Sequence, residues 1–391
     1  MRQAAILGSV GATFLRLGLT SFGGPVAHLG YLHAECVERQ RWVDEARYAD
    51  LVALCQFLPG PASSQLVFAL GMHRAGLPGA LVASVCFLLP SAAAMIAFAY
   101  GVAALGDPGQ AGWLHGLKIA AVAVVAQAVW AMGTKLCTDR ARVTICLVAA
   151  ALVLLAPGAL AQVGVILGGA ALGWALYRDQ EAPAAAPAPP ARGHGAAVLA
   201  LLLFAALLVV PRLVGGRLAT LFEAFYRSGA LVFGGGHVVL PLLREAMVPR
   251  GWLTDSAFLA GYGAAQAVPG PLFSFAGYLG AMIGVSDRPW LGGLFGLGAI
   301  FLPAWLLIGG ALPFWDRLRT TTWAQACLRG ANASVVGVLL AALFTPVMSE
   351  AIRGPRDVAA ALASFALLEV WKAPPWAVVL LAGAAGHALA A

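Results

Sequence analysis

A succession of apolar runs, separated by charged residues or by Pro and Gly breaks, occupies almost the whole chain. Backbone groups find no water in hydrocarbon, so a run of about 20 apolar residues crosses a membrane as a helix. Only 10% of the 391 residues are charged, whereas a soluble domain carries roughly 25%. The sequence therefore predicts an all-α polytopic membrane protein. About thirteen candidate membrane helices lie near 5–29, 51–72, 77–104, 113–134, 143–156, 159–177, 195–211, 219–242, 256–283, 290–313, 323–347, 357–371 and 374–390.

Two of these runs, 143–156 and 357–371, are short for a membrane crossing. Each is followed closely by proline and by a further apolar run. We therefore keep two interpretations for each: a full span, or one arm of a short hairpin that does not cross.

Composition also narrows the classes of function. The net charge of +7 fits basic loops that face the cytoplasm, and the Lys and Arg residues are scattered singly, without the patch that nucleic-acid binding requires. The six cysteines form no CxxC pair, so we expect no metal site, disulfide or cofactor. The motifs GxxxxGK[ST], HExxH and GxSxG are absent, which argues against a P-loop ATPase and against the commonest hydrolases. We predict that the protein is not an enzyme.

The two halves of the chain resemble each other. FLRLGLTSFGGP at 14–25 aligns with FYRSGALVFGGG at 225–236, and QFLPGPASSQ at 56–65 aligns with QAVPGPLFSF at 266–275. The matches occur in the same order in both halves, and chance does not produce such an ordered set. They indicate an internal duplication of about six helices.

The duplication predicts a domain organisation. The stretch 178–194, rich in Ala and Pro, is typical of a semi-rigid extended linker. We expect an N-terminal transporter repeat at 1–177, a connecting transmembrane helix at 195–211, and a C-terminal repeat at 212–391. Six spans and one connecting helix place the second repeat upside down, as in the inverted-topology repeats of many secondary transporters. The distribution of Lys and Arg between loops favours a cytoplasmic N-terminus.

Arg16 and Arg227 occupy equivalent positions in the duplication, each six residues before Phe-Gly-Gly. An arginine within an apolar helix costs at least ~2.5 kcal/mol, so it is usually paired or functional. Snorkelling is the alternative for Arg16, and Glu223, one turn before Arg227, is a ready structural partner. Because both halves carry the arginine, we favour a binding role.

Pro-Gly-Pro motifs interrupt apolar runs in both halves. Proline suits the first turn of a helix, so Pro61 and Pro271 can each open a half-helix whose free N–H groups and positive dipole attract an anion. The alternatives are a simple proline kink and a close glycine contact. Since we find no matching intramembrane carboxylates, an anionic substrate is favoured over a cation. The predicted substrate site comprises Arg16, Gly23, Gly24, Gln56, Pro59, Gly60, Pro61, Ser63 and Ser64, with Arg227, Gly234, Gly235, Gln266, Pro269, Gly270, Pro271 and Ser274.

His28 and His237 follow the glycines, and we consider them, together with Glu223, as candidates for carrying a coupling proton. An interfacial role at a helix end is the alternative for each histidine. We place the carboxylates Glu35 and Asp255 in loops and expect them to be solvated.

These segments, extended to RLGLTSFGGPVAH (16–28) and VFGGGHVVLP (232–241), resemble the signature segments of the chromate ion transporter family. The resemblance covers nearly the whole chain and implies a long, two-domain member. It implies export of chromate from the bacterial cytoplasm across the inner membrane, driven by the proton motive force or by exchange. Sulfate, of similar shape and charge, is the implied competitor. The second half has Gly236 where the first has Pro25, so the halves can contribute unequally to the site.

Two functions are consistent with these features. The first is a secondary active oxyanion exporter, and the second is an oxyanion channel or passive permease, or a sulfate-type uptake carrier, that uses the same site. The expected partners are the oxyanion and the lipid bilayer. The sequence leaves open the coupling ion and whether the chain forms a homodimer.

Overall fold

The computed structural model of the protein describes residues 2–21, 24–104, 112–156, 159–178, 194–232, 236–285, 287–315 and 321–390. Within these ranges all regular structure is helical and no β-strand occurs, as the composition predicts. Gly23, Gly234 and Gly235 of the predicted site, and residues 179–193 of the predicted linker, lie outside the described residues.

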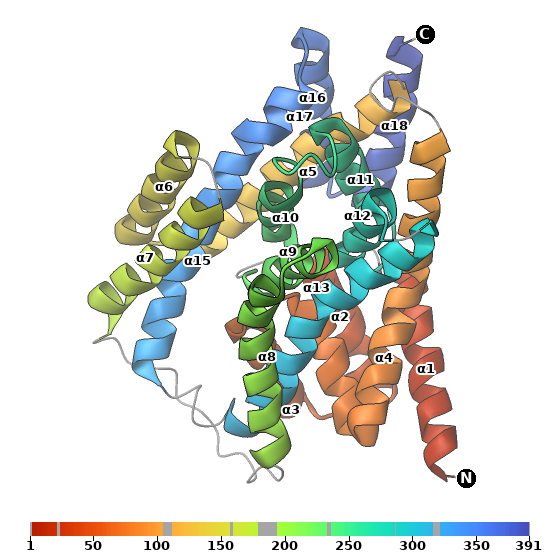
Figure 1. The fold of residues 1–391 in the computed structure, drawn as a ribbon, viewed down its shortest axis with the longest axis vertical. Coiled ribbons are helices and arrows are strands. Elements are labelled where there is room, and N and C mark those ends of the chain that lie inside the picture. The colour runs from red at the N-terminus through yellow and green to blue at the C-terminus, as the bar shows by residue number, and fades with distance from the viewer. Residues whose placement is uncertain are drawn as a thin grey trace.

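Helices follow one another along both halves (Figure 1). The first half contains α1 (Arg2–Thr20), α2 (Gly24–His33), the π-helix η1 (Ala34–Arg39), α3 (Glu45–Phe57), α4 (Ala62–Ala104), α5 (Gly112–Leu136), α6 (Arg140–Leu155), α7 (Ala159–Tyr177) and α8 (His194–Val214). The second contains α9 (Arg217–Ala230), η2 (Gly236–Val238), α10 (Val239–Met247), α11 (Asp255–Ala267), η3 (Leu272–Ser274), α12 (Phe275–Ile283), α13 (Pro289–Ala311), η4 (Leu312–Phe314), α15 (Thr322–Ala342), η5 (Leu343–Met348), α16 (Ser349–Ala351), α17 (Pro355–Glu369) and α18 (Pro375–Ala390).

Five described segments are long and apolar enough to cross a membrane, namely Ala62–Ala104, Gly112–Leu136, Gly195–Val214, Pro289–Phe314 and Thr322–Ala351. Three shorter apolar helices accompany them. The predicted number of thirteen membrane helices is not confirmed, because several runs are broken inside. The run 5–29 divides into α1 and α2, and the run 219–242 divides into α9, η2 and α10. Both divisions fall at Phe-Gly-Gly, where glycines follow the end of the first helix.

Each half contains a tight helical hairpin built on glycines. In α4 the chain turns at Gly76, whose φ is +64°, and the backbones of Gly71 and Gly79 then touch. In the second half, Gly280 of α12 and Gly292 of α13 make the corresponding backbone contact. A Cβ at any of these contacts would overlap an opposing carbonyl, so glycine is what lets the two arms approach.

The first helix of each half packs on its hairpin at one equivalent glycine. A Cβ on Gly18 of α1 would lie 2.5 Å from the carbonyl oxygen of Phe87 in α4. A Cβ on Gly229 of α9 would meet the carbonyl oxygen of Ile300 in α13. Gly18 aligns with Gly229, and Phe87 aligns with Ile300. The duplication read from the sequence is therefore present in the packing.

The remaining helices are exchanged between the halves. Both α6 and α7 pack on α15 of the second half, while α17 and α18 pack on α5 of the first (Figure 1). Small residues again permit close crossing: Gly169 and Gly173 meet Gly330, and Gly386 meets Gly116. In such a reciprocal arrangement each half completes the other, as in an isologous contact between two subunits.

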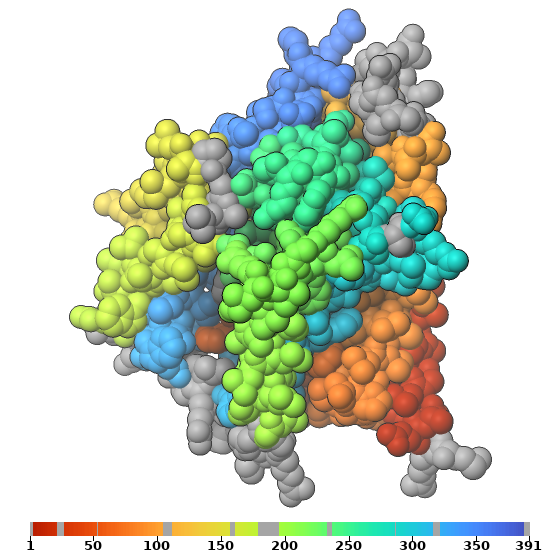
Figure 2. Space-filling view, in the orientation of Figure 1, coloured from red at the N-terminus to blue at the C-terminus, as the bar shows by residue number. Residues whose placement is uncertain are grey.

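The described chain ends lie at opposite ends of the long axis, with the start of α1 at the bottom of Figure 1 and the end of α18 at its top. Helix α8 lies at the front of the molecule, and α6 and α7 form the left edge of the molecule (Figure 2). Large apolar side chains of α8, among them Leu199, Leu202 and Val209, are exposed. In a chain of this composition such a face fits contact with lipid.

Candidate functional site

The broken helices of the two halves meet by a reciprocal exchange of hydrogen bonds. The backbone N–H of Gly60 donates to the carbonyl of Val232 at 2.6 Å, and the N–H of Gly270 donates to the carbonyl of Ser21 at 2.9 Å. Ser21 and Val232 are equivalent residues, each directly before Phe-Gly-Gly. Thus each Pro-Gly-Pro motif contacts the glycine break of the opposite half.

The Pro-Gly-Pro geometry follows from its residues. Gly60 and Gly270 have φ values of +123° and +102°, a region that side chains with a Cβ rarely adopt. Helix α4 begins directly after Pro61, and η3 begins directly after Pro271. Both prolines therefore open helical segments, as predicted. The side-chain amide of Gln65 donates to the carbonyl of Pro59 at 2.8 Å and closes the first turn.

Polar side chains predicted for the site are distributed unevenly around these breaks. Ser63, Ser64 and Ser274 are buried, whereas Gln56 is exposed. Among the described residues, Ser64 Oγ and Gln266 Nε2 are buried atoms without a hydrogen-bond partner. Such atoms are costly in an apolar interior, which makes these two candidates for contact with a polar ligand or water.

The two histidines lie beside the same breaks. The Nε2 of His28 lies 3.1 Å from the carbonyl oxygen of Ser21, which also accepts from Gly270, and the ring packs edge-on against Phe87. The Nδ1 of His237 lies 2.7 Å from the Tyr262 hydroxyl. Both are structurally engaged in the interior rather than interfacial.

Arg16 is ion-paired, and its partner corrects one expectation from the sequence. Glu35 is buried in η1 and not solvated in a loop, and its Oε2 lies 2.5 Å from Arg16 Nη2 and 3.2 Å from Arg39 Nη1. Gln40 donates to its other oxygen at 3.0 Å. Asp255, also expected to be solvated, is largely covered and forms a bidentate pair with Arg244. Sequence spacing alone did not reveal these pairs because they join different helices or cross an irregular turn.

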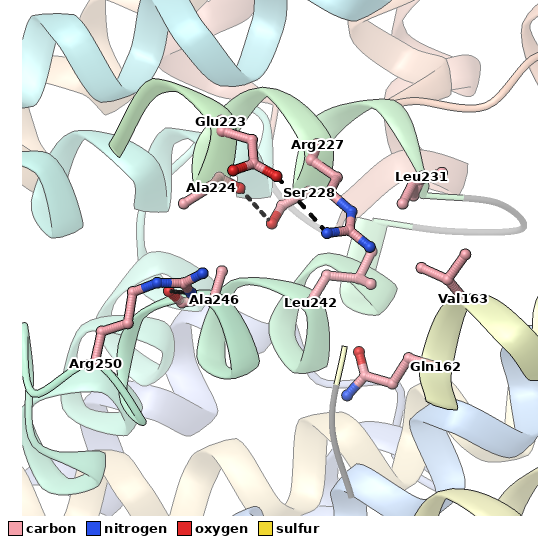
Figure 3. A pocket seen from close by; sticks show the side chains of 10 residues that line it. All are labelled: Gln162, Val163, Glu223, Ala224, Arg227, Ser228, Leu231, Leu242, Ala246 and Arg250. Atoms are coloured by element: carbon pink, nitrogen blue, oxygen red, sulfur yellow. Dashed lines mark hydrogen bonds and ion pairs between the residues drawn. The ribbon is translucent and has the colours of Figure 1, made fainter. Parts of the chain in front are cut away.

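Arg227 lies in a pocket of about 50 Å³ between α7, α9 and α10 (Figure 3). That volume exceeds the ~10–15 Å³ that one water molecule needs, so the pocket can hold a small polyatomic ion or several waters. Its lining is formed by Gln162, Val163, Glu223, Ala224, Arg227, Ser228, Leu231, Leu242, Ala246 and Arg250.

The electrostatics of this pocket are positive. Glu223 Oε1 lies 2.5 Å from Nε of Arg212 and 3.8 Å from Nη1 of Arg227, so Arg212 is its closer partner. Arg250 donates to the carbonyl of Ala246 and carries no carboxylate partner in the described residues. The lining itself carries two arginines and one glutamate, a net charge of +1, and Arg212, outside the lining, adds a third positive charge beside Glu223. Because the Arg227 side chain is three-quarters buried, this charge is screened less than on an open surface.

Sequence reasoning identified Arg227 and Glu223 but missed Arg250 and Gln162. Arg250 follows the end of α10, and Gln162 comes from α7, a helix that the chain reaches long before α9 (Figure 3). The Oε1 of Gln162 is buried without a partner among the described residues. Gln162 is a polar residue within the apolar run 159–177, and this feature could have marked it as a candidate site residue.

Comparison with known proteins agrees with this organisation. The family model "Chromate transporter" matches twice, at residues 8–174 and 219–387. The chain is 31% identical to a chromate transport protein of Pseudomonas aeruginosa, over 96% of this chain and 90% of that protein. It is 28% identical to a chromate transport protein of Cupriavidus metallidurans, over 92% and 87% of the two chains. No solved structure matches it significantly. The chain is therefore a member of the chromate transporter family, a multi-pass membrane protein built from two family repeats.

Proposed function

We propose that the chain is a secondary active transporter that exports chromate across the bacterial inner membrane and binds it in the Arg227 pocket. The observation that carries this proposal is a small cavity lined by Arg227 and Arg250, whose lining carboxylate, Glu223, lies closer to Arg212 outside the lining. Chromate is a dianion at neutral pH and would neutralise the two lining arginines. The names of the two relatives support the same substrate class.

The chemistry of binding follows from the arginines. A guanidinium presents donors in a planar fork that fits two oxygens of an oxyanion, and charge-assisted hydrogen bonds are about twice as strong as neutral ones. Because Arg212 holds Glu223 more closely, Arg227 is free to turn its fork toward the cavity. Gln162 lines the same space, and its side-chain NH2 group is a neutral donor for an oxyanion. Sulfate offers the same charge and shape and is the expected competitor.

The broken helices supply the proposed route. We place the path at the Pro-Gly-Pro motifs, where Ser64 and Gln266 carry unpartnered buried atoms. The halves form an inverted repeat in this proposal, which the reciprocal bonds of Gly60 and Gly270 support. In this proposal the described residues predicted at these breaks line the path rather than the resting pocket.

Coupling to a proton gradient is the proposed source of energy. His28 and His237 lie beside the two breaks, and Glu223 lies in the pocket, so a proton taken up at any of them would change the local charge that the oxyanion meets. The N-terminus is cytoplasmic in this proposal, in keeping with termini at opposite ends of the molecule.

Transport by purified protein in proteoliposomes tests the mechanism. We expect radiolabelled chromate to accumulate against its gradient when a proton gradient is imposed and to stop doing so when an ionophore collapses it. Flux that only equilibrates chromate, and that the ionophore leaves unchanged, would identify a passive channel instead.

Binding tests the site. We expect Arg227→Lys, which keeps the charge but loses the planar fork, to weaken chromate binding about tenfold or more. The matched control is Arg217→Lys on the same helix, where the arginine lies outside the pocket and donates to the backbone carbonyls of Ile283 and Gly284 at the α12 terminus. Equal chromate affinity in Arg227→Lys and Arg217→Lys would remove Arg227 from the site.

A further inference from the structure

Each half carries two arginines at equivalent positions, but the residue that lies between the two arginines differs between the halves. Arg16 corresponds to Arg227 at a spacing of 211 residues, and Arg39 corresponds to Arg250 at the same spacing. In the first half, both arginines contact the carboxylate of Glu35 on the intervening helix. In the second half, 211 residues after Glu35, Ala246 lines the same pocket as Arg227 and Arg250, and its backbone carbonyl accepts a hydrogen bond from Arg250.

Other contacts support the alignment of the two halves at a spacing of 211 residues. His33 pairs with Glu45 as Arg244 pairs with Asp255, and His33 and Arg244 are 211 residues apart. Two further pairs at that spacing are matched in burial: Leu32 with Leu243, and Cys36 with Met247. The backbone N–H of Trp42 donates to Cys36, and that of Trp252 donates to Met247. The two tryptophans are 210 residues apart, so the first half has one extra residue, which the match of Arg39 with Arg250 places directly after the π-helix.

Glu35 is therefore held as a bound anion would be. One carboxylate oxygen accepts from Arg16 and Arg39, and the other accepts from Gln40. The equivalent arginines of the second half, Arg227 and Arg250, line an open pocket, with Ala246 in its wall. Glu245, the neighbouring carboxylate, does not line that pocket. The methyl group of Ala246 leaves free the volume that a glutamate side chain would occupy.

We propose that Glu35 is a resident anion that permanently fills the first-half copy of the oxyanion site, so that each chain binds one oxyanion, at Ala246 between Arg227 and Arg250. This inference rests on the proposed function, since it assigns the position and number of the sites used by that transporter. It also makes Ala246 a specificity-determining position, because the side chain there decides whether the two arginines face an internal carboxylate or an external ligand.

The charge balance gives the physical reason for the difference. A buried carboxylate fixed between two arginines competes with any free anion at an effectively very high local concentration. The second half has its own carboxylate, Glu223, but Arg212 holds it at 2.5 Å, closer than Arg227 at 3.8 Å. The position between Arg227 and Arg250 consequently remains available.

Equilibrium dialysis with radiolabelled chromate, on the purified full-length chain in detergent, tests the inference. We expect one chromate per wild-type chain, and binding weakened at least about tenfold in Ala246→Glu, where the new carboxylate takes the place of the ligand. Ala246→Gln has the same size without the charge, so it is the matched control and should weaken binding less. In Glu35→Ala the first-half site is vacated, and we expect a second chromate per chain.

Each outcome bears on the inference in a defined way. Wild-type affinity in Ala246→Glu would overturn it, as would equal weakening by Ala246→Gln and Ala246→Glu. If Glu35→Ala elutes as a folded protein on size exclusion and still binds one chromate, the resident-anion role of Glu35 is wrong. If Glu35→Ala does not fold, the two Ala246 variants decide. In all these cases chromate binding by the wild type keeps the proposed function intact, whereas a wild type that binds neither chromate nor sulfate refutes both.

Discussion

Replacing Gly270 by alanine tests the central contact between the halves. Gly270 has φ = +102°, and its N–H donates to the carbonyl of Ser21 in the opposite half. A Cβ at this position would lie 3.0 Å from Ser91 Oγ and 3.2 Å from Ser91 Cβ. The substitution therefore strains the backbone and crowds α4 at the same point.

The magnitude follows from these terms. A residue with a Cβ in such a conformation costs roughly 1–3 kcal/mol. Crowding of Ser91 and weakening of the hydrogen bond to Ser21 add about 1–2 kcal/mol. Alanine also restricts the unfolded chain, which offsets about 0.4–1 kcal/mol of this destabilisation. We therefore expect Gly270→Ala to lower the free energy of unfolding by about 1–5 kcal/mol.

Gly298→Ala is the matched control. Gly298 lies in α13 on an exposed face, and a Cβ there meets no atom within 4 Å. Alanine at an exposed helical position should be neutral or stabilise by up to about 1 kcal/mol. Unfolding in mixed detergent micelles of increasing SDS fraction, followed by tryptophan fluorescence, compares the two. An unfolding midpoint for Gly270→Ala equal to that of Gly298→Ala would refute the assigned role of this glycine.

Two further predictions concern ion pairs outside the pocket. Burial acts to raise the pKa of Asp139, the N-cap of α6, but hydrogen bonds from the Arg142 backbone, the Tyr177 hydroxyl and the Arg142 guanidinium outweigh it and hold the pKa at about 2. A lowered pKa stabilises the fold above the unfolded value near 3.9 and loses that effect as the pH falls through about 2. The stability difference between wild type and Asp139→Asn should hence be constant from pH 8 to 5; a difference that changes across that range contradicts the assignment. Arg244→Lys loses the bidentate contact with Asp255, at 2.6 and 2.9 Å, and should lower the free energy of unfolding by about 1 kcal/mol in the same SDS titration, whereas an unchanged midpoint would show the pair to be energetically neutral.

The residue types Pro and Gly predicted those features of the fold that depend on the backbone conformation of a single residue. Pro61 and Pro271 open helical segments, and Gly60 and Gly270 supply positive φ, because these residue types restrict or free the backbone wherever they occur. The duplication was visible for the same reason, since close packing at Gly18 and its counterpart tolerates no side chain in either half.

Contacts between distant segments were not predictable in this way. Nothing in the run 159–177 indicates that α7 packs on α15 of the other half, or that Gln162 faces Arg227. Glu35 was misplaced because its sequence neighbours are polar, which is typical of a loop, although a π-helix carries it into the interior. A partner on another helix offsets the cost of burying a carboxylate, and sequence spacing does not identify that partner.

The one-residue difference between the halves explains why the sequence did not reveal the asymmetry of the proposed anion site. Aligning the tryptophans, Trp42 with Trp252, opposes Glu35 to Glu245 and makes the halves look alike in charge. The hydrogen bonds of those tryptophans show that the extra residue comes after Cys36, which shifts Glu35 onto Ala246. The halves are then alike in both arginines and unlike in the carboxylate. In the proposed arrangement the carboxylate of Glu35 fills the site of the first half and an external oxyanion fills the site of the second. This one difference between the halves is enough for each chain to bind a single anion.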